Sequence, residues 1–340
     1  MDILRAPITD PSAWHGPDFA DDESWIDVLT AAELAELDAA LQSVKERGLE
    51  QCSFGPDEFP LPTLSLRLKK IADELENGRG FSLIRGLPVE KYTLDDVRHL
   101  YWGMGVYLGR AVSQNIQGDL IADVKDRGID YSKAEGRGYS SNATLRPHND
   151  GTDAVTLLCW KNPKFGGTSS IASATAIYNQ ILEDRPEYLD TVYSGFNYYL
   201  RKEGASKDPN EVTRAKIPIY SYFKDRLSSR FNPKMIEGAA EKTGEPLSAD
   251  ACEAIHYMEA LANSPEFRLS ITFQLGDIQL LNNHSIYHTR ESFVDGDTAD
   301  QQRHLLRLWL YLHNVRELAP DFTDRYNTGV GQGIAVRAAE

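Results

Sequence analysis

"LRPHNDGTDAVTLLCW" (residues 145–160) places a histidine and an aspartate two residues apart, directly ahead of an apolar stretch typical of a strand. Alternate residues of a strand point to the same face of a sheet. His148 and Asp150 would therefore direct an imidazole and a carboxylate toward one point. The pair is ambiguous by itself, because most His-X-Asp triplets are solvated surface residues. A polar turn and two ligands of a metal ion are the alternatives.

Strand patterns dominate the chain from His148 onward. "VTLLCW" (155–160) and "TSSIAS" (168–173) are short and rich in β-branched residues, and "FRLSITFQL" (267–275) alternates apolar and polar residues. One capped helix, predicted within 248–265, interrupts these strands. Many strands with few βαβ alternations favour a closed or double-sheet β architecture over a doubly wound sheet.

The first third of the chain carries helix patterns. Thr30 stands three residues ahead of Glu33, a capping box that predicts a helix ending at Gly48. Further helices are expected over 64–78 and 94–109, with a short strand at 80–86 between them. No internal repeat or linker interrupts the 340 residues. We therefore expect a single domain over residues 1–340, helical over about 1–110, of mainly β (α+β) class.

The composition limits the partners and the compartment. The chain is 41% hydrophobic and 26% charged, with a formal net charge of −15. This charge would repel nucleic acid and anionic membranes, but it leaves room for a small anion held by a few arginines. Three cysteines without motif spacing fit a reducing compartment. No secretory signal and no apolar run of about 20 residues is present, so the sequence predicts a cytoplasmic protein without membrane contact.

A second histidine motif follows far downstream in "GDIQLLNNHSIYHTR" (276–290). Two histidines and one carboxylate form the facial triad that binds non-haem iron(II) and leaves coordination positions open. Either His284 or His288 could be the third ligand, and spacing alone does not choose between them. An ordinary loop histidine is the alternative.

The third motif is "RHLLRLWLYL" (303–312). One face of this strand is largely leucine, which indicates a covering helix layer, and the other face carries Arg303 and Arg307. A buried guanidinium is costly unless it meets an anion, and its planar fork binds carboxylates with two hydrogen bonds. A solvated edge strand is the alternative. A metal triad beside such arginines suggests an iron(II) enzyme with a dicarboxylate oxo acid as cosubstrate.

These motifs together resemble the taurine dioxygenase and clavaminate synthase-like family of iron(II)/2-oxoglutarate-dependent oxygenases. The matching pieces are "HND" (148–150), "NNHSIYH" (282–288) and "RHLLR" (303–307), and the resemblance covers about residues 81–313. It implies a double-stranded β-helix, or jelly roll, over about residues 80–315. It also implies that His288, rather than His284, joins His148 and Asp150 as an iron ligand.

The resemblance extends to the residues around the metal. Thr175 and Arg303 match positions that bind 2-oxoglutarate. Arg307 matches a position that holds an acidic group of the substrate. Which of the two arginines binds 2-oxoglutarate and which binds the substrate stays open. Gln114 and Asn115 are expected to reach the substrate, by analogy of position only.

The implied reaction consumes 2-oxoglutarate and dioxygen (O2), releases succinate and CO2, and oxidises a C–H bond. Because Asp150 is present, a halogenase is disfavoured. Hydroxylation of a small carboxylate-bearing molecule is the expected outcome, with desaturation, cyclisation or epimerisation as alternatives. A zinc hydrolase and a catalytically inactive binding member of the family also stay open, as does a homo-oligomer. The segments 194–204 and 217–231 are interpreted as pocket wall or as surface strands with core tyrosines.

Overall fold

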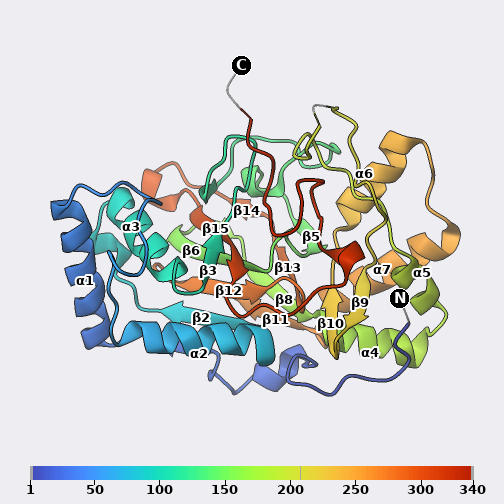
Figure 1. Cartoon of the computed structure of the whole chain (residues 1–340), viewed down its shortest axis with the longest axis horizontal. Helices are drawn as coiled ribbons and strands as arrows, with labels where there is room; N and C mark the ends of the chain where they lie inside the picture. Colours follow the sequence, from blue (N-terminus) through green and yellow to red (C-terminus); the bar gives the residue numbers. More distant parts are fainter. Residues whose placement is uncertain (1–2, 207, 338–340) are drawn as a thin grey trace.

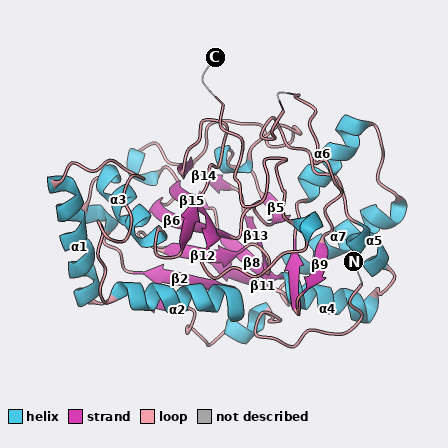
Figure 2. Cartoon of the chain, in the orientation of Figure 1, coloured by secondary structure: helices cyan, strands magenta, loops and turns pink. Residues whose placement is uncertain are grey.

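The computed structural model describes residues 3–206 and 208–337 (Figure 1). Its strands form a central block with helices on both sides (Figure 2). The strands are β1 (Ile26–Val28), β2 (Phe81–Arg85), β3 (Gly109–Ala111), β4 (Ile121–Val124), β5 (Leu145–His148), β6 (Ala154–Lys161), β7 (Phe165–Gly166), β8 (Ser169–Ser173), β9 (Tyr220–Phe223), β10 (Arg226–Ser229), β11 (Arg268–Ile271), β12 (Ile278–Asn282), β13 (Ile286–Arg290), β14 (Phe293–Val294) and β15 (His304–Leu312).

The helices divide into an N-terminal and a C-terminal group. The α-helices are α1 (Ala31–Glu46), α2 (Leu64–Asn77), α3 (Leu94–Gly105), α4 (Ala174–Asp184), α5 (Tyr188–Ser194), α6 (Pro233–Thr243) and α7 (Ala249–Asn263). Short 3-10 turns occupy Gly16–Phe19, Val89–Lys91, Gly138–Ser140, Ala299–Gln301 and Pro320–Phe322.

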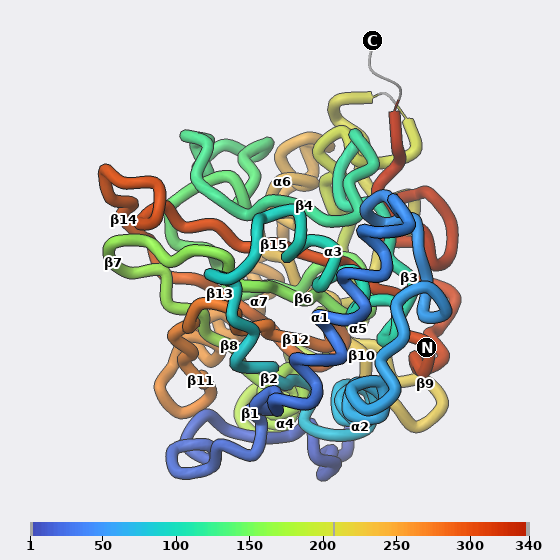
Figure 3. The backbone as a smooth tube through the Cα atoms, turned by 90° about the vertical axis from the view of Figure 1, so that its left-hand side faces the viewer, coloured from blue at the N-terminus to red at the C-terminus, as the bar shows by residue number. Residues whose placement is uncertain are grey.

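The larger sheet has the order β1-β2-β12-β6-β15-β3, and β4 also pairs with β15. Its outer face packs on α1, α2 and α3 through a leucine-rich core that includes Leu306, Leu308 and Leu310 of β15. Figure 3, viewed from the α1 side, shows α1 crossing in front of the sheet. The predicted helix layer over the leucine face of 303–312 is therefore confirmed.

The smaller sheet has the order β11-β8-β13-β5, with every pair antiparallel. Helix α7 packs on β5 and β8, and α4 and α5 pack on α7. Residues of both sheets, among them Val155, Ile171, Tyr287 and Trp309, share one core. The expected double-sheet α+β architecture is confirmed, because the inner faces of the two sheets meet in this core.

Local sequence signals explain several element boundaries. Thr30 accepts a hydrogen bond from the Glu33 N–H at 3.3 Å, while the Glu33 carboxylate accepts one from the Thr30 N–H at 2.8 Å, so the predicted capping box starts α1. The prediction of one strand over 267–275 is wrong beyond Ile271. The chain leaves the sheet there, and Leu275 is 48% exposed.

The turn at Gly276 returns the chain to the larger sheet. Gly276 has a φ of +80°, and a Cβ atom there would lie 1.8 Å from the Leu87 carbonyl oxygen. A glycine is therefore required for this close approach. The adjacent Asp277 is fully buried, and its carboxylate accepts two 2.9 Å hydrogen bonds from Arg85. This charge pair fixes the start of β12, the strand that leads to the second histidine motif.

Among the residues described, no helix is both long enough and apolar enough to cross a membrane.

Candidate active site

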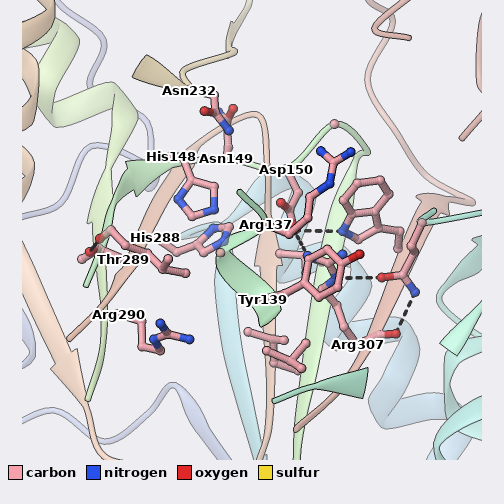
Figure 4. A pocket seen from close by; sticks show the side chains of 18 of the residues that line it. Arg137, Tyr139, His148, Asn149, Asp150, Asn232, His288, Thr289, Arg290 and Arg307 are labelled. Atoms are coloured by element: carbon pink, nitrogen blue, oxygen red, sulfur yellow. Dashed lines mark hydrogen bonds and ion pairs between the residues drawn. The ribbon is translucent and has the colours of Figure 1, made fainter. Parts of the chain in front are cut away.

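Three side chains predicted as metal ligands converge between the two sheets. The ligand atoms of His148, Asp150 and His288 all lie within 4.8 Å of one another (Figure 4). His148 ends β5 and is the direct register partner of His288 on β13, and their ring centroids are 4.3 Å apart. Asp150 follows two residues after His148, just beyond the end of β5. The antiparallel pairing of β5 with β13 thus joins residues that lie far apart in the sequence.

Both histidine rings have a protonation state that suits metal binding. Nδ1 of His148 lies 2.8 Å from the Arg146 carbonyl oxygen. Since a carbonyl oxygen can only accept, Nδ1 must carry the proton and donate it. The other ring nitrogen, Nε2, is then unprotonated and free to bind a metal. The Nδ1 atom of His288 is buried and has no hydrogen-bond partner among the described residues. Burial lowers the pKa of His148, and burial together with His148 lowers the pKa of His288 to about 3. Both rings are therefore neutral, as metal ligation requires.

Asp150 is held as a carboxylate by its neighbours. Trp309 Nε1–H donates to Asp150 Oδ2 at 2.8 Å, and Arg307 Nη1 lies 3.5 Å from the same oxygen. Burial alone would raise the pKa of Asp150, but the pKa is lowered, and the charge of Arg307 is the largest contribution that lowers it, with the Trp309 hydrogen bond also contributing. Its backbone N–H donates to Asn283 Oδ1 at 3.0 Å, so the "NNH" segment positions the carboxylate as well.

His284 is held in a separate polar cluster. It is 1% exposed, its Nε2 lies 2.9 Å from Asp153 Oδ1, and Nη2 of Arg325 lies 3.2 Å from its Nδ1. Burial and Arg325 outweigh Asp153 and lower the pKa of His284 to about 4. The structure therefore groups His288, and not His284, with the other two ligands.

The triad opens into a cavity between the two sheets. Arg303, Leu305, Arg307 and Trp309 of the closing strand all line it, as the strand pattern predicted for the non-leucine face. The charged and polar residues that line the cavity are Gln114, Tyr131, Arg137, Tyr139, His148, Asn149, Asp150, Ser169, Arg201, Glu203, Arg230, Asn232, His288, Thr289, Arg290, Arg303, Arg307 and Tyr326.

Arg303 is a buried cation that the described residues leave without an anionic hydrogen-bond partner. It is 4% exposed, and its Nη1 has no hydrogen-bond partner in the part of the chain described. The nearby Asp295 accepts from the backbone N–H of Arg303 at 2.7 Å. Burial lowers the pKa of Arg303 to about 10. Leaving a buried guanidinium unpaired is costly, so the cavity around Arg303 is suited to an anion.

Arg307 is already partnered. Its Nε–H donates to Gln114 Oε1 at 2.7 Å, and its guanidinium lies between the rings of Tyr139 and Trp309, at 5.0 and 4.7 Å. Arg307 therefore has partners without any bound substrate, because Asp150 and Gln114 contact it. Gln114 is 1% exposed and also donates to the Arg307 carbonyl at 2.8 Å, so it positions this arginine.

Two predicted binding residues lie elsewhere. Ser173 caps α4, so Thr175 falls in the first turn of a helix rather than on a strand, and its hydroxyl lies 2.8 Å from Ser12 Oγ. Asn115 closes a surface turn through a 2.8 Å hydrogen bond to Asp119. Neither residue lines the cavity. Ser169, which faces Arg290 in the register of β8 with β13, lines the cavity instead, and its hydroxyl donates to Gln279 Oε1 at 3.4 Å.

Several cavity residues were missed as individual site residues. Arg201 and Glu203 come from segment 194–204, Arg230 comes from segment 217–231, and Tyr326 comes from the C-terminal segment. The structure thus places the two aromatic and basic segments in the pocket wall, the first of the two interpretations of the sequence. Their charge was the available signal, because arginines beside buried tyrosines are unusual in a surface strand.

The donor set fits iron(II). Two neutral imidazoles and one carboxylate, partly buried and grouped around one point, match the ligand set of non-haem iron(II) oxygenases. The Nδ1 of His288, unpartnered among the described residues, and the open cavity beside the triad agree with this assignment. Fold and site together define an iron(II)-dependent oxygenase with room for an anionic cosubstrate.

The comparisons with known proteins identify the family. Residues 45–309 match the family model described as "Taurine catabolism dioxygenase TauD, TfdA family". The chain is 31% identical to FR-33289 synthase of Streptomyces rubellomurinus over 93% of this chain and 94% of that protein. It is 29% identical to the taurine hydroxylase-like protein SAT17 of Stachybotrys chartarum, over 90% and 80% of the two chains. The chain belongs to the TauD/TfdA family of iron(II)- and 2-oxoglutarate-dependent dioxygenases.

Solved structures share the fold at low sequence identity. Asparagine oxygenase in complex with Fe(II), 3-hydroxyasparagine and succinate superposes with a TM-score of 0.67, at 16% identity, over 84% of this chain and 93% of that one. The oxygenase OrfP in complex with Fe and α-ketoglutaric acid gives a TM-score of 0.57 at 16% identity, over 84% and 94%. The predicted double-stranded β-helix is confirmed, and iron(II) and 2-oxoglutarate are the cofactor and cosubstrate.

Proposed function

We propose that this enzyme hydroxylates an unactivated C–H bond of a small molecule that bears a carboxylate or a related acidic group. The observation that carries the proposal is the excess of arginines in the cavity onto which the His148, Asp150 and His288 triad opens. Bound iron(II) with 2-oxoglutarate would supply the oxidising chemistry, with succinate and CO2 as coproducts.

Arg303 is the proposed anchor for the distal carboxylate of 2-oxoglutarate. A guanidinium fork matches a carboxylate with two parallel hydrogen bonds, and the dry surroundings strengthen them. Ser169 is the proposed hydroxyl partner in place of Thr175. Such an anchor would hold the oxo acid so that its other end lies beside the three ligands.

Arg307 is the proposed contact for an acidic group close to the metal. Gln114 and two aromatic rings fix its guanidinium, so it keeps its orientation at low entropic cost. Its Nη1 lies 3.5 Å from Asp150, a separation that also keeps this ligand ionised. Gln114 would then act as a positioning residue and not as a substrate contact.

An acidic substrate is supported by the charges of the cavity. Six arginines line it, Arg137, Arg201, Arg230, Arg290, Arg303 and Arg307, against the carboxylates of Asp150 and Glu203. Asparagine oxygenase and OrfP, which share the fold, are named with 3-hydroxyasparagine and L-Arg; these molecules carry a carboxylate but are not net anions, so they support a small carboxylate-bearing molecule and not its net charge. A neutral or cationic substrate would leave this excess of buried positive charge uncompensated.

The test is a screen of small acidic molecules for 2-oxoglutarate consumption, scored by succinate release and by product mass. The proposal predicts substrate-dependent succinate and a product heavier by one oxygen atom. A product lighter by two hydrogen atoms would indicate desaturation or cyclisation instead of hydroxylation. A product of unchanged mass would indicate epimerisation. Turnover only with neutral molecules would contradict the acidic substrate.

A further inference from the structure

We infer that the substrate carries, besides the acidic group proposed to contact Arg307, a group with two negative charges that is bound by Arg201 and Arg230, named here the arginine pair. This inference rests on the proposed function, because it concerns the substrate of the same cavity. The cavity arginines differ in how far residues of the chain already satisfy them, and this difference singles out the pair.

Four of the six cavity arginines have an assigned partner. Arg137 Nη1 lies 3.1 Å from Glu203 Oε2, and Arg307 Nη1 lies 3.5 Å from Asp150 Oδ2. Arg290 donates to the carbonyl oxygens of Ser141, at 2.9 Å, and of Ala143. Arg303 is the proposed 2-oxoglutarate anchor. The arginine pair is what remains.

Both members of the pair have unused donors. The Nε atoms of Arg201 and Arg230 are buried and lack hydrogen-bond partners among the described residues. The remaining contacts are long: Arg201 Nη1 lies 3.5 Å from the Gly136 carbonyl, and Arg230 Nη2 lies 3.4 Å from the Arg325 carbonyl. Arg230 is only 3% exposed. A buried donor without a partner is rare in native proteins, and two in one cavity wall indicate a ligand.

The position of Arg230 is tied to the metal ligands. Asn149, which lies between His148 and Asp150, donates its backbone N–H to the Phe231 carbonyl and accepts the Phe231 N–H on its Oδ1, both at 2.9 Å. The Arg230 guanidinium stacks on Tyr198 at 4.7 Å and lies 5.8 Å from the ring of Tyr326. These contacts hold the cation in the wall of the cavity that the triad also lines.

Arg201 is directed into the same wall by an unusual backbone. Arg201 and Lys202 are consecutive non-glycine residues with positive φ, +51° and +65°. Residues other than glycine rarely adopt this conformation, and such strain persists where the surroundings enforce it. Arg137 helps to hold this backbone conformation, because its Nη2 donates a 2.6 Å hydrogen bond to the Arg201 carbonyl oxygen.

The charge of the ligand follows from this arrangement. Each guanidinium of the pair needs one negative charge to offset its burial. Glu203 interacts with Arg201, but its carboxylate is already ion-paired with Arg137 at 3.1 Å. The matching group is a dianion, such as a dicarboxylate or a phosphoryl group, whose oxygens suit two guanidinium forks. A monocarboxylate would neutralise only half of the pair.

The test compares sulfate, a dianion, with acetate, a monoanion. Each is titrated by calorimetry into the anaerobic iron(II)- and 2-oxoglutarate-loaded enzyme at constant ionic strength. We expect sulfate to bind at least about tenfold more tightly than acetate, and Arg201→Gln and Arg230→Gln each to weaken sulfate binding at least about tenfold, on the order of 1.4 kcal/mol. Arg226→Gln is the matched control, because Arg226 lies near Arg230 in the sequence but bonds the exposed side chain of Asn77.

Equal affinity for sulfate and acetate, or sulfate affinity unchanged in both pair variants, would overturn the inference. If Arg230→Gln fails to fold, Arg230→Lys is used in its place for the sulfate titration. Lysine keeps the positive charge but lacks the planar fork that binds two oxygens. Failure of the proposed function has a different signature. In that case the wild-type enzyme would not bind 2-oxoglutarate, while calorimetry would still show sulfate binding that depends on the arginine pair.

Discussion

His148 and His288 are direct partners in the register of β5 with β13, and their rings lie 4.3 Å apart at the centroids. The distance between two metal ligands is therefore set by strand pairing and not by a flexible loop. His284, four residues from His288, is more deeply buried and bonds Asp153. The two histidines of this segment can be separated experimentally, since one faces the cavity and the other does not.

Substitution of these two histidines should affect iron(II) binding differently. His288→Ala removes one of three ligands, so iron(II) affinity should fall by at least about tenfold to a hundredfold. His284→Gln should keep iron(II) affinity within about threefold of the wild-type value, because His284 lies outside the group of metal ligands. Anaerobic iron(II) titration of both variants measures this. The reverse result would place His284 on the metal.

The buried His284 should also make stability depend on pH. The pKa of His284 falls from 6.5 to about 4 on folding, because burial and Arg325 outweigh Asp153. Below pH 6.5 the unfolded chain takes up a proton that the folded protein does not, so the free energy of unfolding decreases as the pH falls. The loss should be on the order of 3 kcal/mol between pH 6.5 and pH 4.

The control for this pH dependence is His284→Gln. Denaturant unfolding across this pH range should show a flatter pH dependence in the variant than in the wild-type protein, since glutamine does not titrate. Parallel curves for the two proteins would show that His284 does not carry the effect.

Arg303 should dominate the binding of 2-oxoglutarate. Arg303→Gln removes a charged hydrogen-bonding fork from the proposed site, a loss of about 3 kcal/mol, or roughly a hundredfold in Kd. Arg290→Gln is the matched variant, because the Arg290 guanidinium already donates to the carbonyl oxygens of Ser141 and Ala143. It should lower the melting temperature while changing 2-oxoglutarate affinity, measured by calorimetry, by less than about threefold. Equal losses of affinity would assign the anchor to both arginines.

Gly151, beside the ligand Asp150, should not tolerate a side chain. A Cβ atom there would lie 2.2 Å from the Tyr326 hydroxyl oxygen, so Gly151→Ala must displace the buried tyrosine ring. Overpacking of this kind costs about 1–3 kcal/mol. The variant should unfold at lower denaturant concentration and turn over 2-oxoglutarate more slowly.

A double-mutant cycle checks the cause of that effect. In the background of Tyr326→Ala the Gly151→Ala substitution should cost clearly less, because the clashing ring is absent. Additive effects would mean that the glycine acts through another neighbour.

The parts of the site that the sequence predicted share a local signature. His148 and Asp150 follow the two-residue period of a strand, and the alternation of 303–312 correctly separates Arg303 and Arg307 from the leucine face. The choice of His288 over His284 needed the family resemblance, because both histidines lie in one polar segment and differ only in what packs against them.

The remaining site residues depend on tertiary structure. Thr175 was placed by distance along the chain, but the Ser173 cap converts that position into the start of a helix. Arg201 reaches the cavity through a strained turn, and Arg230 through the pairing of its neighbour Phe231 with Asn149. Neither contact has a period or a motif in the sequence, so composition suggested the segments while the structure identified the residues.

The most direct test of the iron site is the visible spectrum of the anaerobic protein with iron(II) and 2-oxoglutarate. We expect a charge-transfer band that saturates at one iron per chain and is absent from His148→Ala. A wild-type protein that shows no such band, or a His148→Ala variant that keeps it, would contradict the assignment of His148, Asp150 and His288 as the iron ligands.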